Sequence, residues 1–326
     1  MRVRLPISVA IGDYDITRPI IDGVVQPDGL QVTPIVLASP QRHWRMLRHR
    51  EFDACELSLG SYAAAVSHGD DSMVGLPVFP HRRFRHSYIF VSGTRSISSA
   101  SELVGGRLGI RSWQTTAGIY MRGILSDDYG LPPESVTWVA QDAEDVGIRL
   151  PKTIRLEQVT DGQRVTDLCA DGRLDGLLYP EIPAQVRAGT GEIRRLFADP
   201  RAEEESYFRH TGVFPIMHLV VVRRELVEKH PWIARNLVDA FVESKRLAQR
   251  RLSDPRVVSL AWLRWLYEHE HDVLGPHAWD YGLGSRNRHV VSTFLRYAAT
   301  QGLVGHATGV ADLFLASVCD DPPRYV

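Results

Sequence analysis

The chain has 326 residues, of which 44% are hydrophobic, and its formal net charge is -1 at pH 7. A chain of this length can bury a substantial core and is long enough for two domains of ordinary size. The near-zero charge gives no general attraction for nucleic acids or anionic membranes, and no apolar run reaches the length of a membrane span. We therefore expect neither kind of partner.

The cysteines and the N-terminal segment bear on the compartment. Cys55, Cys169 and Cys319 are far apart, odd in number and match no metal-binding spacing. This usage favours reduced, mostly buried thiols. The first residues lead directly into a strand-like run and contain no apolar stretch typical of a signal peptide. The sequence thus predicts a soluble cytoplasmic protein.

The N-terminal part of the chain predicts strands and helices in alternation. Strands are expected over 7–11, 30–37 and 52–57, with helices from about Thr17, over 41–50 and from Leu59. Strands separated by helices at this spacing favour a parallel sheet with both faces covered. Ligands of such sheets gather at the carboxyl ends of the strands. We therefore expect one rim of the sheet to carry Asp13, Tyr14, Glu56 and Ser58.

Two apolar runs rich in β-branched residues, 85–91 and 214–222, each contain a histidine near their start, His86 and His218. Segments that predict separate α/β units flank each run. We interpret the two runs as strands that carry the chain out of one lobe and back again. Because ligand pockets concentrate at domain interfaces, both imidazoles are expected at the mouth of a cleft between the lobes.

These crossings define the expected domain organisation, which is an α/β protein of two lobes. Lobe 1 combines residues 1–91 with residues 213–326, and lobe 2 contains residues 92–212. The C-terminal part of lobe 1 predicts mainly helices, including one over 234–252 with apolar residues at helical spacing.

Lobe 2 contains a candidate anion site at the start of a helix. A buried strand over 108–110 leads to a helix that begins within 114–118. The backbone amides of such a helix start suit a carboxylate or a phosphate. The candidate substrate-binding residues in this region are Ser112, Trp113, Gln114, Thr115 and Thr116, and Trp113 is expected to stack on an aromatic ring. Tyr179, at the end of a strand that stops at a proline, is a further candidate.

Several short stretches occur together in an order typical of one family. They are Gly12–Asp15, Trp44–Leu47, Phe52–Ser58, Pro77–Pro80, Phe84–Ser87, Arg122–Leu125, Phe214–His218, His230–Trp232 and Tyr281–Leu283. As a collinear set that covers nearly the whole chain, they resemble 4,5-dihydroxyphthalate decarboxylase and its relatives, which are similar to type II periplasmic binding proteins. The segments 111–116 and 140–144 differ from the family pattern, so the ring substitution of the substrate is left open.

The resemblance implies a two-lobed fold with two crossover strands. It also implies decarboxylation of a dihydroxylated aromatic diacid to protocatechuate, without an organic cofactor. The candidate acids are His218 and His86, because an imidazole has a usable protonated fraction near neutral pH. Glu56 or Asp13 is expected to accept the phenol proton or to orient a histidine.

A basic cluster provides candidate ligands for the substrate carboxylate. Arg85, and after it Arg82 or Arg83, is expected to hold a carboxylate through the fork geometry of its guanidinium. Each candidate also has a structural interpretation. A histidine at the end of a buried strand is often part of the hydrogen-bonded structure, and these arginines also fit a solvated turn with a salt bridge. Asp13 equally fits a turn acid.

Three functions stay open at this point. The first is the aromatic-acid decarboxylase, which the two histidine-bearing runs favour. The second is a non-catalytic, cytosolic or exported solute-binding protein for a small aromatic carboxylate, and the third is another reaction on the same scaffold. The histidines of Glu268–His271 lie two residues apart, so they face different sides of a helix and predict a solvated helix end. A divalent metal that assists the carboxylate and a homo-oligomer are left open.

Overall fold

The computed structural model describes residues 4–160 and 162–319, which fold into two compact units. Unit 1 consists of the described residues of Met1–Arg82, Ile216–Val291 and Gly309–Val326. Unit 2 consists of the described residues of Arg83–Pro215 and Ser292–Thr308. The chain therefore passes from unit 1 to unit 2 directly after Arg82 and returns directly before Ile216.

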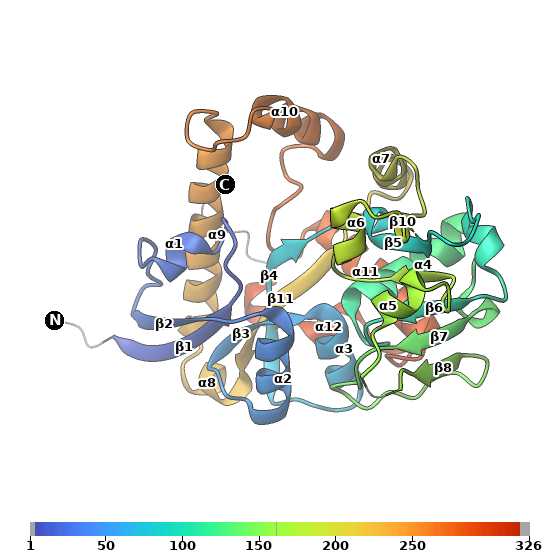
Figure 1. Cartoon of the computed structure of the whole chain (residues 1–326). Helices are drawn as coiled ribbons and strands as arrows, with labels where there is room; N and C mark the ends of the chain where they lie inside the picture. Colours follow the sequence, from blue (N-terminus) through green and yellow to red (C-terminus); the bar gives the residue numbers. More distant parts are fainter. Residues whose placement is uncertain (1–3, 161, 320–326) are drawn as a thin grey trace. The chain divides into compact units, whose positions relative to one another are not determined.

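Unit 1 is built on a mixed sheet that has five strands within the described residues, in the order β2–β1–β3–β11–β4 (Figure 1). The strands are β1 (Leu5–Ile11), β2 (Leu30–Val36), β3 (Ala54–Ser58), β4 (Met73–Arg82) and β11 (Ile216–Arg223). β1 is parallel to β2 and β3, whereas β11 is antiparallel to β3 and β4. Because β1, β3 and β4 all end where β11 begins, their last residues share one edge of the sheet.

Unit 1 also contains helices, some of which pack on this sheet. They are α1 (Arg18–Ile21), α2 (Ser39–His49), α3 (Leu59–Ser67), α8 (Arg224–Lys229), α9 (Trp232–Ser253), α10 (Leu263–Leu274), α12 (Val310–Leu313) and the 3₁₀ helix η4 (Ala316–Val318). α2 packs on β3, α3 packs on β3 and β11, and α9 packs on β4. Ser58 ends β3 and caps α3, because its hydroxyl accepts a hydrogen bond from the N–H of Ser61.

Unit 2 contains a second mixed sheet, with six strands in the described residues and the order β10–β5–β9–β6–β7–β8. The strands are β5 (Ile89–Ser92), β6 (Arg107–Ile110), β7 (Thr137–Ala140), β8 (Arg155–Gln158), β9 (Gly176–Leu178) and β10 (Ile193–Arg195). The helices are α4 (Thr116–Tyr129), α5 (Val165–Ala170), α6 (Ala184–Ala188), α7 (Pro200–Thr211) and the 3₁₀ helices η1 (His86–Tyr88), η2 (Ala100–Leu103) and η3 (Pro133–Ser135). Helix α11 (Ser285–Thr300) begins with residues of unit 1 and ends with residues of unit 2.

The α/β fold class expected from the sequence is confirmed, while two details differ from the expectation. The run 85–91 is not one strand, because η1 takes up its first part and β5 begins only at Ile89. Residues 83–91 and 292–308, expected in lobe 1, lie in unit 2, and so do residues 213–215. The second segment is held there by Gln301, whose backbone carbonyl accepts a hydrogen bond from Nε1 of Trp113.

Two further expectations concern membrane-spanning helices and the cysteine thiols. Within the described part of the chain, no helix is long and apolar enough to cross a membrane. Cys55 and Cys169 are buried and Cys319 is partly buried, and none of the three forms a disulfide with another. The cleft between the lobes stays a prediction.

Candidate active site in unit 1

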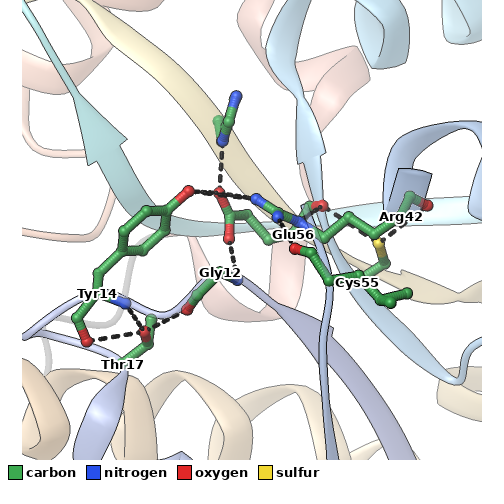
Figure 2. Close-up of polar contacts among 8 residues, drawn as sticks. Gly12, Tyr14, Thr17, Arg42, Cys55 and Glu56 are labelled. Atoms are coloured by element: carbon green, nitrogen blue, oxygen red, sulfur yellow. Dashed lines mark hydrogen bonds and ion pairs between the residues drawn. The ribbon is translucent and has the colours of Figure 1, made fainter. Parts of the chain in front are cut away.

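A buried carboxylate forms the centre of the polar cluster in unit 1. Glu56, on β3, is fully buried, and both of its oxygens accept hydrogen bonds. The Tyr14 hydroxyl donates to Oε1 (2.8 Å), the Gly12 N–H donates to Oε2 (2.8 Å), and Nη2 of Arg42 lies 2.6 Å from Oε1. Figure 2 shows the phenol of Tyr14 and the guanidinium of Arg42 converging on this carboxylate.

The sheet edge brings these residues together. Gly12 directly follows β1, the strand that is parallel to β3, so its N–H lies next to the carboxylate of Glu56. A side chain at position 12 would collide with Tyr14, since a Cβ there would lie 2.5 Å from Cζ of the phenol ring. Glycine at this position is therefore what lets Tyr14 fold back over the end of β1.

Arg42 reaches the cluster from α2 and is itself buried. Its Nη1 donates to the carbonyl of Leu37 (2.7 Å), Nε donates to the carbonyl of Glu56 (3.2 Å), and Nη2 donates to the Tyr14 hydroxyl (3.2 Å). These bonds fix the guanidinium from several directions. A buried ion pair with this many hydrogen bonds has the geometry that offsets the desolvation of its charges.

The charges of this cluster shift the pKa of each member. Burial raises the pKa of Glu56, but the charge of Arg42 and the hydrogen bonds from His218 and Gly12 outweigh burial and hold this pKa well below its usual range. Burial likewise opposes the charge of Arg42, and the charge of Glu56 outweighs it and raises the pKa of Arg42. Burial and the charge of Glu56 raise the pKa of the Tyr14 phenol. At neutral pH, Glu56 is therefore a carboxylate and Tyr14 a neutral donor.

His218, on β11, joins the cluster through its ring. Its Nδ1 is hydrogen-bonded to Oε1 of Glu56. Since an ionised carboxylate can only accept, Nδ1 is the donor and carries a hydrogen. In the sheet, His218 lies between Ser58 of β3 and His81 of β4, and its side chain is largely buried. A carboxylate in this position fixes the tautomer and orientation of an imidazole and stabilises its protonated form.

Two more imidazoles flank His218. The ring of His81 lies 4.6 Å from that of His218, and the ring of His43, from α2, lies 4.9 Å away, both nearly perpendicular to it. Burial, together with the charges of His218 and Arg42, holds the pKa of His43 well below its usual range. His43 is therefore neutral where His218 is paired with a carboxylate.

These side chains do not form a recognisable metal site. In the described part of the chain, no group of three or more His, Cys, Asp or Glu side chains is arranged to hold a metal ion. The cluster therefore offers a carboxylate with an imidazole held in one orientation, a neutral phenol and a buried cation. This combination can hold and transfer a proton at a fixed place.

Three other predicted residues of unit 1 lie outside the Glu56 cluster. Asp13 is on the surface, where its carboxylate pairs with Nη1 of Arg18 at 2.9 Å. Ser58 caps α3 at the same sheet edge as His218. Arg82, at the end of β4, is buried, and its Nη2 donates to Oδ1 of Asn287 (2.6 Å) and to the carbonyl of Asp280 (3.1 Å).

The second predicted acid, His86, belongs to unit 2 and has different surroundings. Its ring is completely buried among the rings of Tyr129, Phe197 and Tyr207, at centroid distances of 5.3 to 6.0 Å. Neither ring nitrogen has a hydrogen-bond partner among the described residues. Burial lowers the pKa of His86 to about 4, which favours the neutral ring at neutral pH. Its catalytic role stays a prediction, which this apolar setting disfavours.

Arg85 and Tyr179 also lie in unit 2. Arg85 is buried, its guanidinium lies 4.9 Å from the centroid of the Tyr88 ring, and its Nη1 donates to the carbonyl of Pro180 (3.4 Å). Burial lowers the pKa of Arg85 to about 10. Tyr179 is half-buried, and burial raises the pKa of its phenol. The hydrogen bond to Pro180 ties Arg85 to the segment that directly follows Tyr179.

The predicted anion site before α4 holds a carboxylate of the chain itself. The N–H groups of Trp113 and Gln114 donate to the two oxygens of Glu144, at 2.6 and 2.8 Å. The side chain of Gln114 in turn accepts from the N–H of Val146 (2.9 Å). The polar segment after β7 is therefore hydrogen-bonded to Trp113 and Gln114, which the sequence predicted to bind a ligand. Ser112 and Thr115 are joined to each other by their hydroxyls (2.9 Å), and Thr116 begins α4.

Trp113 lies in the core of unit 2 and not at an exposed rim. Its ring is completely buried, with the guanidinium of Arg122 3.8 Å from its centroid and the ring of Trp138 5.8 Å away. Nε1 of the indole donates a hydrogen bond to the backbone carbonyl of Gln301 (3.0 Å). Its expected stacking on an aromatic substrate would need this contact to open.

Sequence reasoning missed Arg42, His43 and His81 as members of the cluster. A signal for the first two exists, because they precede Met46 and Leu47 by one helical turn and so share the buried face of α2. His81 lies next to the last residue of β4, and the sequence offers the apolar run before it as a signal.

Comparison with known proteins places these observations in a family. No family model matches the chain. It is 35% identical over 319 residues to a 4,5-dihydroxyphthalate decarboxylase of Comamonas testosteroni, covering 95% of this chain and 96% of that protein. A 4,5-dihydroxyphthalate decarboxylase of Pseudomonas putida is 35% identical over 214 residues, covering 63% of this chain and 82% of that protein.

A solved structure supports the fold independently. The periplasmic aliphatic sulphonate binding protein SsuA of Escherichia coli matches with a TM-score of 0.58 at 11% identity, covering 97% of this chain and 92% of that chain. This likeness shows the fold of periplasmic binding proteins. Together with the identity over nearly the full length of the Comamonas protein, it leads to one conclusion: the chain belongs to the 4,5-dihydroxyphthalate decarboxylase family.

Proposed function

We propose that this chain is a carboxy-lyase that removes carbon dioxide from 4,5-dihydroxyphthalate, or from a close analogue, to give protocatechuate. Two relatives that are 35% identical carry the name of this activity. The observation in this chain that carries the proposal is the bond between Nδ1 of His218 and the buried carboxylate of Glu56. The cytoplasmic location expected from the sequence is part of the same proposal.

The reaction replaces one carboxylate on an aromatic ring by a proton. A hydroxyl para to the departing carboxylate pushes electron density toward the ring carbon that bears it. A proton adds at this carbon, the bond to the carboxylate then breaks, and the electron pair of that bond returns to the ring as carbon dioxide leaves. The enzyme must therefore supply one proton at a fixed position.

His218 is the residue best suited to supply this proton. Because Glu56 holds Nδ1, the proton delivered to the ring comes from the other ring nitrogen, Nε2. The negative charge of Glu56 stabilises the imidazolium that donates, and the hydrogen bond fixes the plane of the ring. His218 is the catalytic acid in this proposal, and Glu56 is a positioning residue.

The same geometry favours one of the two roles that the sequence left open for Glu56. A base that accepts the phenol proton works best when its pKa lies near the working pH. The pKa of Glu56 lies well below its usual range, because the charge of Arg42 outweighs burial. A carboxylate that holds its proton so weakly is a poor acceptor, so orientation of His218 is the role that we propose.

The proposal is tested by incubating purified protein with 4,5-dihydroxyphthalate and measuring carbon dioxide and protocatechuate, before and after treatment with a chelator. Equal release in both arms supports proton delivery by the chain's own residues. Activity that is lost with the chelator and restored by a divalent ion adds a metal to the mechanism. If nothing is released but the compound raises the melting temperature, the solute-binding function replaces the enzymatic one.

A further inference from the structure

A tyrosine of unit 1 has a buried hydroxyl that the mechanism above does not use. Tyr281 is only 5% exposed, and its hydroxyl has no hydrogen-bond partner among the described residues. A buried phenol normally finds a partner, because leaving its hydroxyl unsatisfied costs about 1–3 kcal/mol. Tyr62, also buried in unit 1, follows this rule and donates to the carbonyl of Leu313 at 2.8 Å.

The backbone on either side of Tyr281 is tied to β4. The carbonyl of Asp280 accepts from Arg82, the last residue of β4 (3.1 Å), and the N–H of Gly282 donates to the carbonyl of Pro77 within the same strand (2.7 Å). Asn287 adds bonds to the carbonyls of Asp280 and Gly282 (2.9 and 2.7 Å). The loop is therefore held on the strand that carries His81 and Arg82.

A lysine side chain lies close to the Tyr281 ring. Nζ of Lys245, from α9, lies 4.9 Å from the ring centroid and is held by the carbonyl of Trp279 (3.0 Å) and by Oδ1 of Asp280 (3.1 Å). A cation near the face of a phenol draws electron density from the ring and makes its O–H a better donor. Burial raises the pKa of Tyr281, while the charge of Arg82 lowers it and that of Glu56 raises it, so this phenol is a neutral donor within range of both charges.

We propose that Tyr281 is a substrate-binding residue whose hydroxyl donates a hydrogen bond to the carboxylate that the substrate retains. This inference rests on the proposed function and extends it to a group that sequence analysis did not select. An unsatisfied donor beside two cations matches a negatively charged acceptor. The retained carboxylate is such an acceptor, and it is present in the diacid and in the product.

The test compares Tyr281→Phe with wild-type protein in steady-state kinetics. Because only a bond to the ligand is lost, KM for 4,5-dihydroxyphthalate rises roughly tenfold or more while kcat stays within about twofold. The dissociation constant of protocatechuate, measured by calorimetry, rises by the same factor because the product keeps this carboxylate. The melting temperature does not fall, since the hydroxyl has no partner in the free protein.

Tyr62→Phe is the matched control, because it removes a buried hydroxyl that does have a partner. It lowers the melting temperature and leaves KM unchanged. Unchanged KM and protocatechuate affinity in Tyr281→Phe would overturn the proposal, and so would a fall in kcat alone. A rise in KM without a change in protocatechuate affinity would assign the contact to the departing carboxylate and would also overturn it. Wild-type protein that binds protocatechuate but releases no carbon dioxide would contradict the proposed function, while the calorimetric comparison would still decide the role of Tyr281.

Discussion

Arg42 in unit 1 and Arg122 in unit 2 are both completely buried, yet Arg42 is paired with a charged group and Arg122 with neutral groups. Arg42 lies 2.6 Å from the carboxylate of Glu56, whereas Arg122 donates to the neutral oxygens of Gln301 (2.7 Å) and Trp113 (2.6 Å). Burial lowers the pKa of Arg122 to about 9, but the charge of Glu56 outweighs burial and raises the pKa of Arg42. The same side chain is thus part of an ion pair in one unit and a hydrogen-bonded packing element in the other.

The difference teaches where proton chemistry can occur. Around Arg42, the carboxylate it stabilises also contacts the imidazole of His218 and the phenol of Tyr14, so groups that exchange protons share one hydrogen-bonded cluster. Arg122, in contrast, packs on the indole ring of Trp113 at 3.8 Å and donates to the amide oxygen of Gln301. A buried charge by itself therefore does not indicate an active site, whereas one that orients a titratable group does.

The largest effects on stability are expected when each arginine is replaced in turn. Arg42→Met leaves Glu56 buried without its cation and should lower the free energy of unfolding by about 3–5 kcal/mol. Arg122→Met removes a buried charge but leaves two acceptors unsatisfied, so about 1–3 kcal/mol is expected. Urea unfolding at pH 7 measures both losses. Adding Glu56→Gln to Arg42→Met should recover part of the loss, and equal losses for the two single variants would contradict the contrast.

Truncation of the proposed acid should have the next largest effect. His218→Ala should reduce kcat by a factor on the order of a hundred or more, because it removes the imidazole that Glu56 orients for proton delivery. Substrate binding, measured by calorimetry with 4,5-dihydroxyphthalate, should stay largely intact. Full turnover in this variant would show that His218 is not the acid.

Neutralising the carboxylate tests whether orientation of His218 matters. Glu56→Gln keeps the shape of the side chain but loses the charge that holds Nδ1, so kcat should fall by about tenfold or more. Asp53→Asn is the matched control, since Asp53 also pairs with an arginine in this sheet (Arg223, 2.8 Å) but is partly exposed. The control should keep its kcat and lose no more than about 1 kcal/mol of stability. A similar fall in kcat for both variants would mean that any charge loss in the sheet disturbs activity.

The smallest effect is expected at His86 and concerns stability against pH. An exposed imidazole titrates near pH 6.5, whereas burial lowers the pKa of His86 to about 4. Below about pH 6.5 the unfolded chain takes up a proton that the folded chain does not, so stability is lost as the pH falls toward 4. Between pH 7 and pH 5.5, wild-type protein should lose about 1 kcal/mol more than His86→Phe in urea unfolding. Parallel pH dependences would show that His86 is protonated in the folded state.

Much of the fold follows from local sequence patterns. Short apolar runs bounded by turn residues predicted β1, β2 and β3 close to their observed bounds, because burial and turn formation act over a few residues. The run at 85–91 failed as a single strand. There, Tyr88 N–H bonds back to the carbonyl of Arg85 and turns the chain, and the buried position of His86 depends on rings from distant segments.

The candidate site could be predicted only in part. Glu56 and Tyr14 were selected because the carboxyl ends of parallel strands share an edge, which is a rule that one sequence can use. His218 was selected for a different reason, because it lies on an apolar run interpreted as a crossing between the lobes. Arg42 lies in a helix that has several other basic residues, and only the packing of α2 on β3 distinguishes it from them. The N–H of Gln114, just before α4, donates a hydrogen bond to Glu144, which lies 30 positions further along the chain. No local sequence pattern predicts a contact over this separation.

The most direct test of proton delivery from His218 is chemical rescue. In His218→Ala, the side chain removed is largely buried and leaves a space of imidazole size beside Glu56. We predict that added imidazole restores carbon dioxide release from 4,5-dihydroxyphthalate by about tenfold or more, saturably, and that it does so much less in His218→Ala/Glu56→Gln. The contradicting result is a His218→Ala protein that binds the substrate and stays folded but is not stimulated by imidazole at any concentration.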